Sequence, residues 1–157
     1  AIFIFLAARG EATMVATQSA LAGVPLRQAM MTDFHCLRAE DQLSEAARAL
    51  LAGAQHDFPV VSESGELEGL LTRSRLIEAL TTAGSSGRVG EVMLREIPTV
   101  PEHYPLREAF QLLQKSPLES LPVVVDGQRR VIGLLTAENV GELILIRSAG
   151  QRGSSTG

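Results

Sequence analysis

The residues best suited to chemistry lie in a threonine-containing segment that occurs twice in the chain. Gly133-Leu134-Leu135-Thr136 is followed three places later by Asn139, and Gly69-Leu70-Leu71-Thr72 is followed by Arg75. Each segment reads as an apolar strand whose final threonine opens a helix. The first backbone N–H groups of a helix have no partner within the helix and can bind an anionic or polar ligand. The two segments therefore predict a polar-ligand site at each strand-to-helix turn.

The two predicted sites differ in the residue that follows the threonine. Asn139 can donate and accept hydrogen bonds, which suits a ribose hydroxyl. Arg75 cannot accept a hydrogen bond, although its guanidinium can contact a phosphate. We therefore expect ligand binding at Thr136 and Asn139 in preference to Thr72 and Arg75, with one ligand per chain or none. In the competing interpretation both threonines only cap their helices, a role worth about 1 kcal/mol.

Composition and spacing argue against several other functions. The formal net charge is −4 and the isoelectric point is about 5.4, whereas a nucleic-acid surface needs a basic patch. Cys36 is the only cysteine, so no internal disulfide can form, and we expect a buried structural thiol in a reducing compartment. The three histidines, His35, His56 and His103, lack metal-ligand spacing. We expect no metal site, no catalytic residue and no nucleic-acid partner.

An internal duplication positions the two threonine segments. Met30 corresponds to Met93 and the Pro-Val-Val run at 59–61 to that at 122–124, in each case 63 positions later. A register held over most of the chain is the mark of a repeated structural unit. Apolar periodicity and turn residues predict the same elements in both copies. These are an extended segment (35–37; 98–100), a helix (43–51; 106–113), a strand (58–61; 121–125), a second strand (67–71; 131–135) and a second helix (73–80; 137–146).

Several boundaries follow from local signals. Asp41 is a favourable N-cap for the first of these helices, and Pro105 suits the first helical position in the second copy. The predicted organisation is an N-terminal helix within residues 1–25, a first repeat over 26–80, a linker over 81–88, a second repeat over 89–146 and a flexible tail over 147–157.

The first eight residues form a wholly apolar run, followed by Arg9. Eight residues are too few to span a bilayer, which takes roughly 20. One interpretation is a helix packed on the domain or on a partner chain. The other is the end of a membrane helix with Arg9 at its cytoplasmic edge, as the positive-inside rule requires. The abrupt apolar start without a methionine suggests a fragment of a longer protein.

The ordered set of motifs resembles a tandem pair of CBS domains, a Bateman module. The resemblance rests on the methionine-containing opening of each repeat, the Pro-Val-Val strands and the Gly-Leu-Leu-Thr segments, which together cover residues 26–146. The resemblance implies an α+β fold of two β-α-β-β-α repeats packed about a pseudo-two-fold axis, and pairing into homodimers. It also implies an adenosine-containing ligand such as AMP, ADP, ATP or S-adenosylmethionine. Thr136 and Asn139 match the family's ligand motif, and Thr99 occupies a position that lines the adenine and ribose pocket.

A weaker resemblance concerns residues 3–12 and the His-Asp-Phe-Pro-Val-Val run at 56–61. Both are similar to site-2 protease-type zinc metalloproteases that carry a cytosolic CBS pair. The protease signature of two histidines around a glutamate is absent here. The resemblance implies a cytoplasmic regulatory module of an integral membrane protease, with no enzyme activity in this chain. The alternative is a structural dimerisation module without a ligand.

Overall fold

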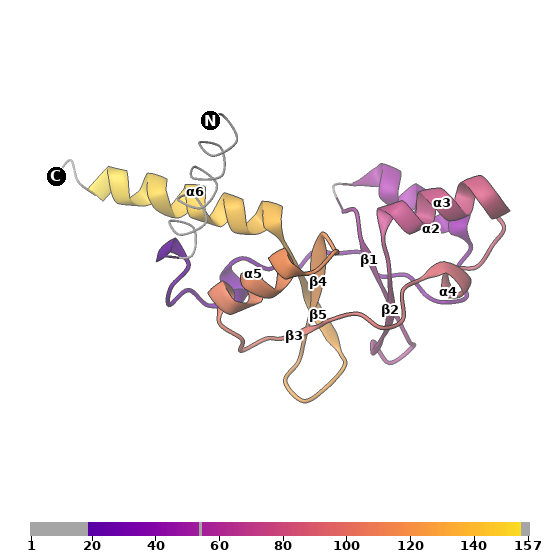
Figure 1. Ribbon diagram of the computed structural model, residues 1–157, viewed down its shortest axis with the longest axis horizontal. Coiled ribbons are helices and arrows are strands. Elements are labelled where there is room, and N and C mark those ends of the chain that lie inside the picture. Colours follow the sequence, from indigo (N-terminus) through magenta and orange to yellow (C-terminus); the bar gives the residue numbers. More distant parts are fainter. Residues whose placement is uncertain (1–18, 54, 155–157) are drawn as a thin grey trace, which may run out of the picture.

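The computed structural model describes residues 19–53 and 55–154, so the apolar run at 1–8 and most of the predicted N-terminal helix lie outside the described residues. Figure 1 shows an elongated molecule in which two β-hairpins stand side by side, with helices beyond each of them. The first repeat contributes η1 (Leu26–Gln28), α2 (Leu43–Ala52), β1 (Phe58–Val61), β2 (Leu67–Leu71) and α3 (Arg73–Ala83). The second contributes α4 (Val89–Val92), β3 (Val100–Pro101), α5 (Leu106–Lys115), β4 (Ser120–Val124), β5 (Val131–Thr136) and α6 (Ala137–Ser154).

Each repeat is built on an antiparallel hairpin, β1–β2 in the first and β4–β5 in the second. Both hairpin turns contain a glycine at positive φ, Gly65 at 85° and Gly127 at 71°, a conformation that favours glycine. The short β3 runs parallel to β4, and its counterpart in the first repeat is a single parallel bridge between Leu37 and Val60. The predicted α+β fold with two repeats is confirmed.

The opening segment of each repeat packs on the hairpin of the other repeat. Met31 and Leu134 of β5 exchange backbone hydrogen bonds of 2.7 and 3.0 Å. Leu94 and Leu70 of β2 do the same at 2.8 Å in both directions. In Figure 1, η1 accordingly lies beside α5 and α4 beside α2 and α3. Each packed unit therefore combines the hairpin of one repeat with the opening segment of the other. We call these opening segments, residues 26–31 and 89–94, the exchanged segments.

Two hydrophobic cores result from this exchange. Unit 1 is packed around β1–β2 and takes Val89 and Met93 from the second repeat into its core. Unit 2 is packed around β3–β4–β5 and takes Leu26 and Ala29 from the first repeat, together with Leu21 and Val24. The strands supply apolar residues such as Phe58 and Leu121, both at most 1% exposed. Because each core contains side chains of both repeats, neither unit is complete without the other repeat's opening segment.

Glycine allows the exchanged segments to approach the hairpins closely. A Cβ on Gly69 would lie 2.6 Å from the Leu94 carbonyl oxygen and 2.7 Å from Met93 Sδ. A Cβ on Gly133 would lie 2.8 Å from Met30 Sδ. The methionine openings and the Gly-Leu-Leu-Thr segments, which are far apart in the sequence, thus meet across the two repeats.

Some local predictions were wrong by a few residues. Gln42, rather than Asp41, is the N-cap of α2, because the Asp41 carboxylate accepts the Arg38 backbone N–H at 2.8 Å. Pro105 is the N-cap of α5 and precedes its first helical residue. Helix α3 continues to Ala83 rather than ending at residue 80, and α6 continues to Ser154 rather than ending near residue 146.

Candidate functional site

The larger of two neighbouring cavities, about 580 Å³, lies where the two repeats meet. Residues 55–57, just before β1, form part of its wall, and residues 118–120, which lead into β4 and include its first residue, form another part. Residues 136–138, where β5 ends and α6 begins, also line it. The remaining lining residues come from the exchanged segment, β5, α3, α5 and the α5–β4 connection: Met31, Arg73, Phe110, Leu113, Gln114, Ser116 and Leu134. The cavity is therefore lined by both apolar and polar side chains.

Asp57 and Ser120 form the polar centre of this cavity. They occupy equivalent positions in the two repeats, 63 residues apart, and the Ser120 hydroxyl donates to Asp57 Oδ2 at 2.8 Å. Their exposed fractions are only 4% and 3%. Equivalent residues of two repeats meet where a pseudo-two-fold axis passes between them. A second such contact is the antiparallel backbone bridge between Glu66 and Arg130 in the hairpin turns. The cavity thus lies on the seam between the repeats.

Burial is the main influence on the Asp57 carboxyl and raises its pKa above 3.8, because a charged form is poorly solvated there. The hydrogen bond from Ser120 and an interaction with the backbone N–H of Arg73 act in the opposite direction but do not cancel the effect of burial. The native state therefore holds this proton more tightly than the unfolded chain does.

Because folding raises the pKa of Asp57, the free energy of unfolding depends on pH. A carboxyl whose pKa is raised on folding stabilises the native state most at pH below its unfolded pKa, and that contribution is lost as pH rises through the native pKa. Asp57→Asn removes the ionisation but keeps an acceptor for Ser120. We expect the variant to gain stability relative to the wild type between about pH 4 and about pH 7. Urea unfolding at both pH values checks this, and a difference that shrinks with rising pH contradicts it.

The structure brings one of the sequence-predicted residues into the cavity wall. Thr136 lines it, and its Oγ1 also accepts the backbone N–H of Asn139 at 3.1 Å. Asn139 is half-buried one turn into α6 and does not line the cavity. The capping role proposed as the competing interpretation is thus present at Thr136, whose second lone pair still leaves the hydroxyl able to meet a ligand.

The other predicted residues lie elsewhere. Thr72 Oγ1 accepts the backbone N–H of Arg75 at 3.3 Å, and Arg75 Nε donates to the Val92 carbonyl at 2.7 Å. Arg75 thus ties α3 to the exchanged helix α4. Thr99 is half-buried directly before β3 and lines neither cavity. The spacing argument missed Asp57 and Ser120, although a polar residue standing before an apolar strand in both repeats marked their positions.

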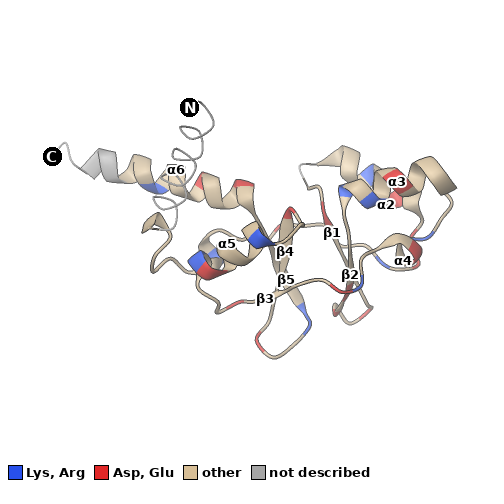
Figure 2. Ribbon diagram, in the orientation of Figure 1, with Lys and Arg blue, Asp and Glu red and all other residues tan. Residues whose placement is uncertain are grey.

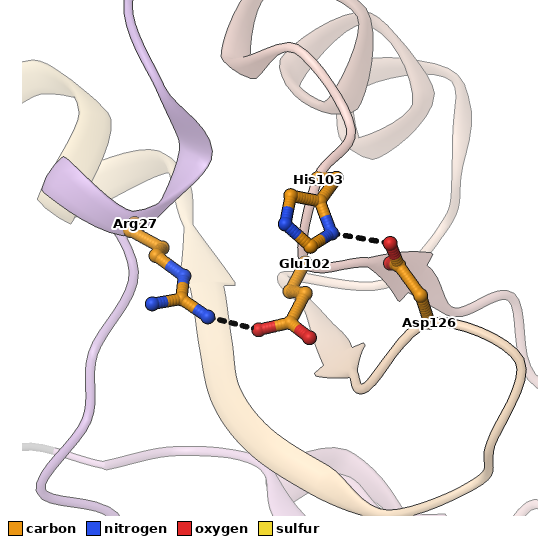
Figure 3. A network of polar contacts seen from close by, with 4 residues as sticks. All are labelled: Arg27, Glu102, His103 and Asp126. Carbon is orange, nitrogen blue, oxygen red and sulfur yellow. Dashed lines mark hydrogen bonds and ion pairs between the residues drawn. The ribbon is translucent and has the colours of Figure 1, made fainter.

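A polar cluster joins the opening segment of the first repeat to unit 2. Figure 3 shows Arg27 of η1 paired with Glu102, beside His103 paired with Asp126. Single ligand atoms of Glu102, His103 and Asp126 lie within 4.8 Å of one another, an arrangement that histidine spacing in the sequence did not indicate. Because Arg27 and His103 already partner the two carboxylates, the arrangement serves to hold η1 and the β4–β5 turn against the loop after β3.

Cys36 is half-buried, and burial raises the pKa of its thiol, which lowers its reactivity at neutral pH. Across residues 19–53 and 55–154, the helices are all too short or too polar to cross a bilayer.

A family model for the CBS domain matches residues 26–82 and 89–145. The zinc metalloprotease Rip3 of Mycobacterium tuberculosis, itself described as putative, is 28% identical over 145 residues, which are 90% of this chain and 37% of the relative. Homoserine O-acetyltransferase of Methanosarcina acetivorans is 24% identical over 139 residues, which are 88% of this chain and 25% of the relative. The chain thus matches 25% of the length of one of these relatives and 37% of the other.

Among solved structures, the CBS domain pair of protein MJ0100, in complex with 5′-methylthioadenosine and S-adenosyl-L-methionine, is 25% identical with a TM-score of 0.70. The match covers 79% of this chain and 98% of that one. The comparison therefore extends over the whole of a solved two-repeat module.

Proposed function

The chain belongs to the CBS domain family, and from this we propose that it is a regulatory module that binds an adenosine-containing ligand in the cavity between its repeats. The observation that carries the proposal is the composition of the cavity wall, to which both repeats contribute. The ligands bound to the MJ0100 domain pair support the adenosyl class. In this proposal Thr136 contacts the ligand and Asn139 is adjacent to its ribose, whereas Thr72, Arg75 and Thr99 have structural roles.

A ligand that bridges the repeats acts through differential affinity. It favours the arrangement of the units in which both walls of the cavity contact it, and it shifts the equilibrium only by its preference for that arrangement. The exchanged segments make the two units move as coupled bodies, so a change at the seam reaches η1 and the residues that precede it.

We further propose that the regulated activity is an attached membrane metalloprotease, with this module on the cytoplasmic side. Similarity to Rip3 supports the proposal. The similar chain of a homoserine O-acetyltransferase shows that related pairs accompany other activities. The coding sequence upstream decides the matter: a membrane-embedded metalloprotease signature supports the proposal, and its absence contradicts it.

The rival function is a dimerisation module without a ligand. It is favoured by large apolar side chains that remain exposed on helices, among them Leu51 at 88%, Leu145 at 71% and Ile146 at 69%. Binding measurements separate the two, because a purely structural module gains no stability from any adenosyl compound.

Thermal melting with AMP, ADP, ATP and S-adenosylmethionine tests the proposed function. A ligand at 100 times its Kd adds about 2.7 kcal/mol, which raises the Tm of a chain of this size by about 5–10 °C. Thr136→Ala is expected to reduce the shift. Thr72→Ala is the matched control, since it removes an equivalent cap of about 1 kcal/mol at a residue that does not line the cavity. No shift with any compound at millimolar concentration contradicts adenosyl binding, and equal loss in both variants contradicts the role of Thr136.

A further inference from the structure

We propose that the seam cavity selects an uncharged or positively charged adenosyl compound, a thioether or sulfonium, and rejects nucleotides that carry phosphates. This inference rests on the proposed function and adds to it the chemical class of the ligand. It follows from the charges of the lining residues, from the acidic side chains near the two helix N-termini, and from the apolar side chains that also line the cavity.

Carboxylates outnumber cationic side chains in the wall. Asp57, Glu119 and Glu138 line the cavity, against one arginine, Arg73. His56 also lines it and lies 3.7 Å from Glu119, so its charge, when present, is directed to that carboxylate. Asp57 carries the most weight because it is almost completely buried, and charges interact more strongly where water is excluded. A phosphate entering this wall meets repulsion, whereas a sulfonium meets attraction.

Both helix N-termini at the cavity have an acidic side chain of the chain itself close by. A helix N-terminus normally favours a phosphate because of its free N–H groups and dipole. At α3, the Asp57 carboxylate interacts with the backbone N–H of Arg73, the first helical residue. At α6, Thr136 takes the N–H of Asn139 and Glu138 lies in the first turn. Figure 2 shows the acidic residues at this end of α6. These acidic side chains oppose the attraction that the two helix N-termini would otherwise exert on a phosphate.

The apolar lining residues suit an adenine ring and a thioether or sulfonium group. Met31, Phe110, Leu113 and Leu134 are among them. Aromatic and aliphatic groups bury a purine face, and the sulfur of methionine is polarisable and accommodates another sulfur substituent. The selection of a sulfur-containing adenosyl compound thus results from apolar contacts together with carboxylates in the cavity wall. Arg73 is the one lysine or arginine among the lining residues that could pair with a phosphate.

Isothermal titration calorimetry of the chain with four probes tests the inference: 5′-methylthioadenosine, S-adenosylmethionine, AMP and ATP. We expect the first two to bind at least about tenfold more tightly than AMP and ATP, the size of one favourable charge contact in a poorly solvated wall. Asp57→Asn should reduce the ratio of the affinity for S-adenosylmethionine to the affinity for AMP by about tenfold. The affinity for 5′-methylthioadenosine should not change. Glu63→Gln is the matched control, because it removes one negative charge at a fully exposed side chain of the β1–β2 turn, outside the wall.

The outcomes separate this inference from the proposed function. If AMP or ATP binds as tightly as the sulfur compounds, the selectivity is overturned while adenosyl binding stands. If Glu63→Gln changes the ratio of the affinities for S-adenosylmethionine and AMP as much as Asp57→Asn does, the effect is one of net charge. The assigned role of Asp57 is then overturned. If none of the four probes binds, the proposed function fails and the selectivity fails with it.

Discussion

Gly69→Ala is expected to destabilise the chain by about 1–3 kcal/mol, near the upper end of that range, because the added methyl overpacks a closed contact. The new Cβ would lie 2.6 Å from the backbone oxygen of Leu94, which accepts the Leu70 N–H, while the Leu94 N–H donates to the Leu70 oxygen. Leu94 cannot withdraw without breaking both hydrogen bonds. The strand β2 and the exchanged segment of the second repeat would have to separate. Glycine in the first Gly-Leu-Leu-Thr segment is thus a packing requirement.

Two further glycines provide graded controls. Gly133→Ala places its Cβ 2.8 Å from Met30 Sδ, the flexible part of a side chain, and 3.2 Å from the Met31 oxygen, so we expect a smaller loss. Gly141 in α6 has nothing within 4 Å, and its replacement by alanine should stabilise the helix by about 0.5–1 kcal/mol. Chemical denaturation of the three variants checks this order. A neutral Gly69→Ala variant would contradict the close approach.

Phe58→Ala is expected to have the largest effect on stability, a loss of about 3–5 kcal/mol. Phe58 begins β1, is 1% exposed, and lies in the core of unit 1 with Val89 and Met93 of the other repeat. At about 2–4 °C per kcal/mol the Tm should fall by about 6–20 °C. Leu51→Ala, at a side chain that is 88% exposed, is the control and should change stability by no more than about 0.5 kcal/mol.

The same variant tests whether the two units unfold together. The exchanged segments, the Asp57–Ser120 contact and the hydrogen bond from the Leu67 N–H to the Arg129 carbonyl all cross between the repeats. We therefore expect one unfolding transition, with lower hydrogen-exchange protection in β4 and β5 as well as in β1 and β2. Full protection of β4 and β5 in Phe58→Ala, or a second transition, would contradict this coupling.

The sequence predicted the elements better than their association. Strands and helices follow local periodicity and turn residues, which is why the hairpins at Gly65 and Gly127 were placed correctly. The exchange of opening segments is invisible to such signals, because Met30 and Gly133 are more than a hundred residues apart and only packing joins them. Asp41 was wrongly taken as a cap because the sequence does not show that Arg38 competes for its carboxylate.

The sequence predicted only part of the candidate site, again because local signals do not reveal contacts between the repeats. Thr136 follows from the strand-to-helix turn, which is local. Asp57 and Ser120 depend on the contact of equivalent residues across the seam, and Arg75 depends on its bond to the exchanged helix α4. Residues whose role arises between the repeats could be found only once the two repeats were placed together.

Hydrogen exchange of the chain with and without saturating S-adenosylmethionine tests most directly whether a ligand binds at the seam. We expect slower exchange in peptides that contain residues 55–57, 118–120 and 136–138, which form the cavity wall, and unchanged exchange in the β1–β2 turn at 62–66. Protection confined to one repeat, or a rise in Tm without protection at these three segments, would contradict a ligand site between the repeats.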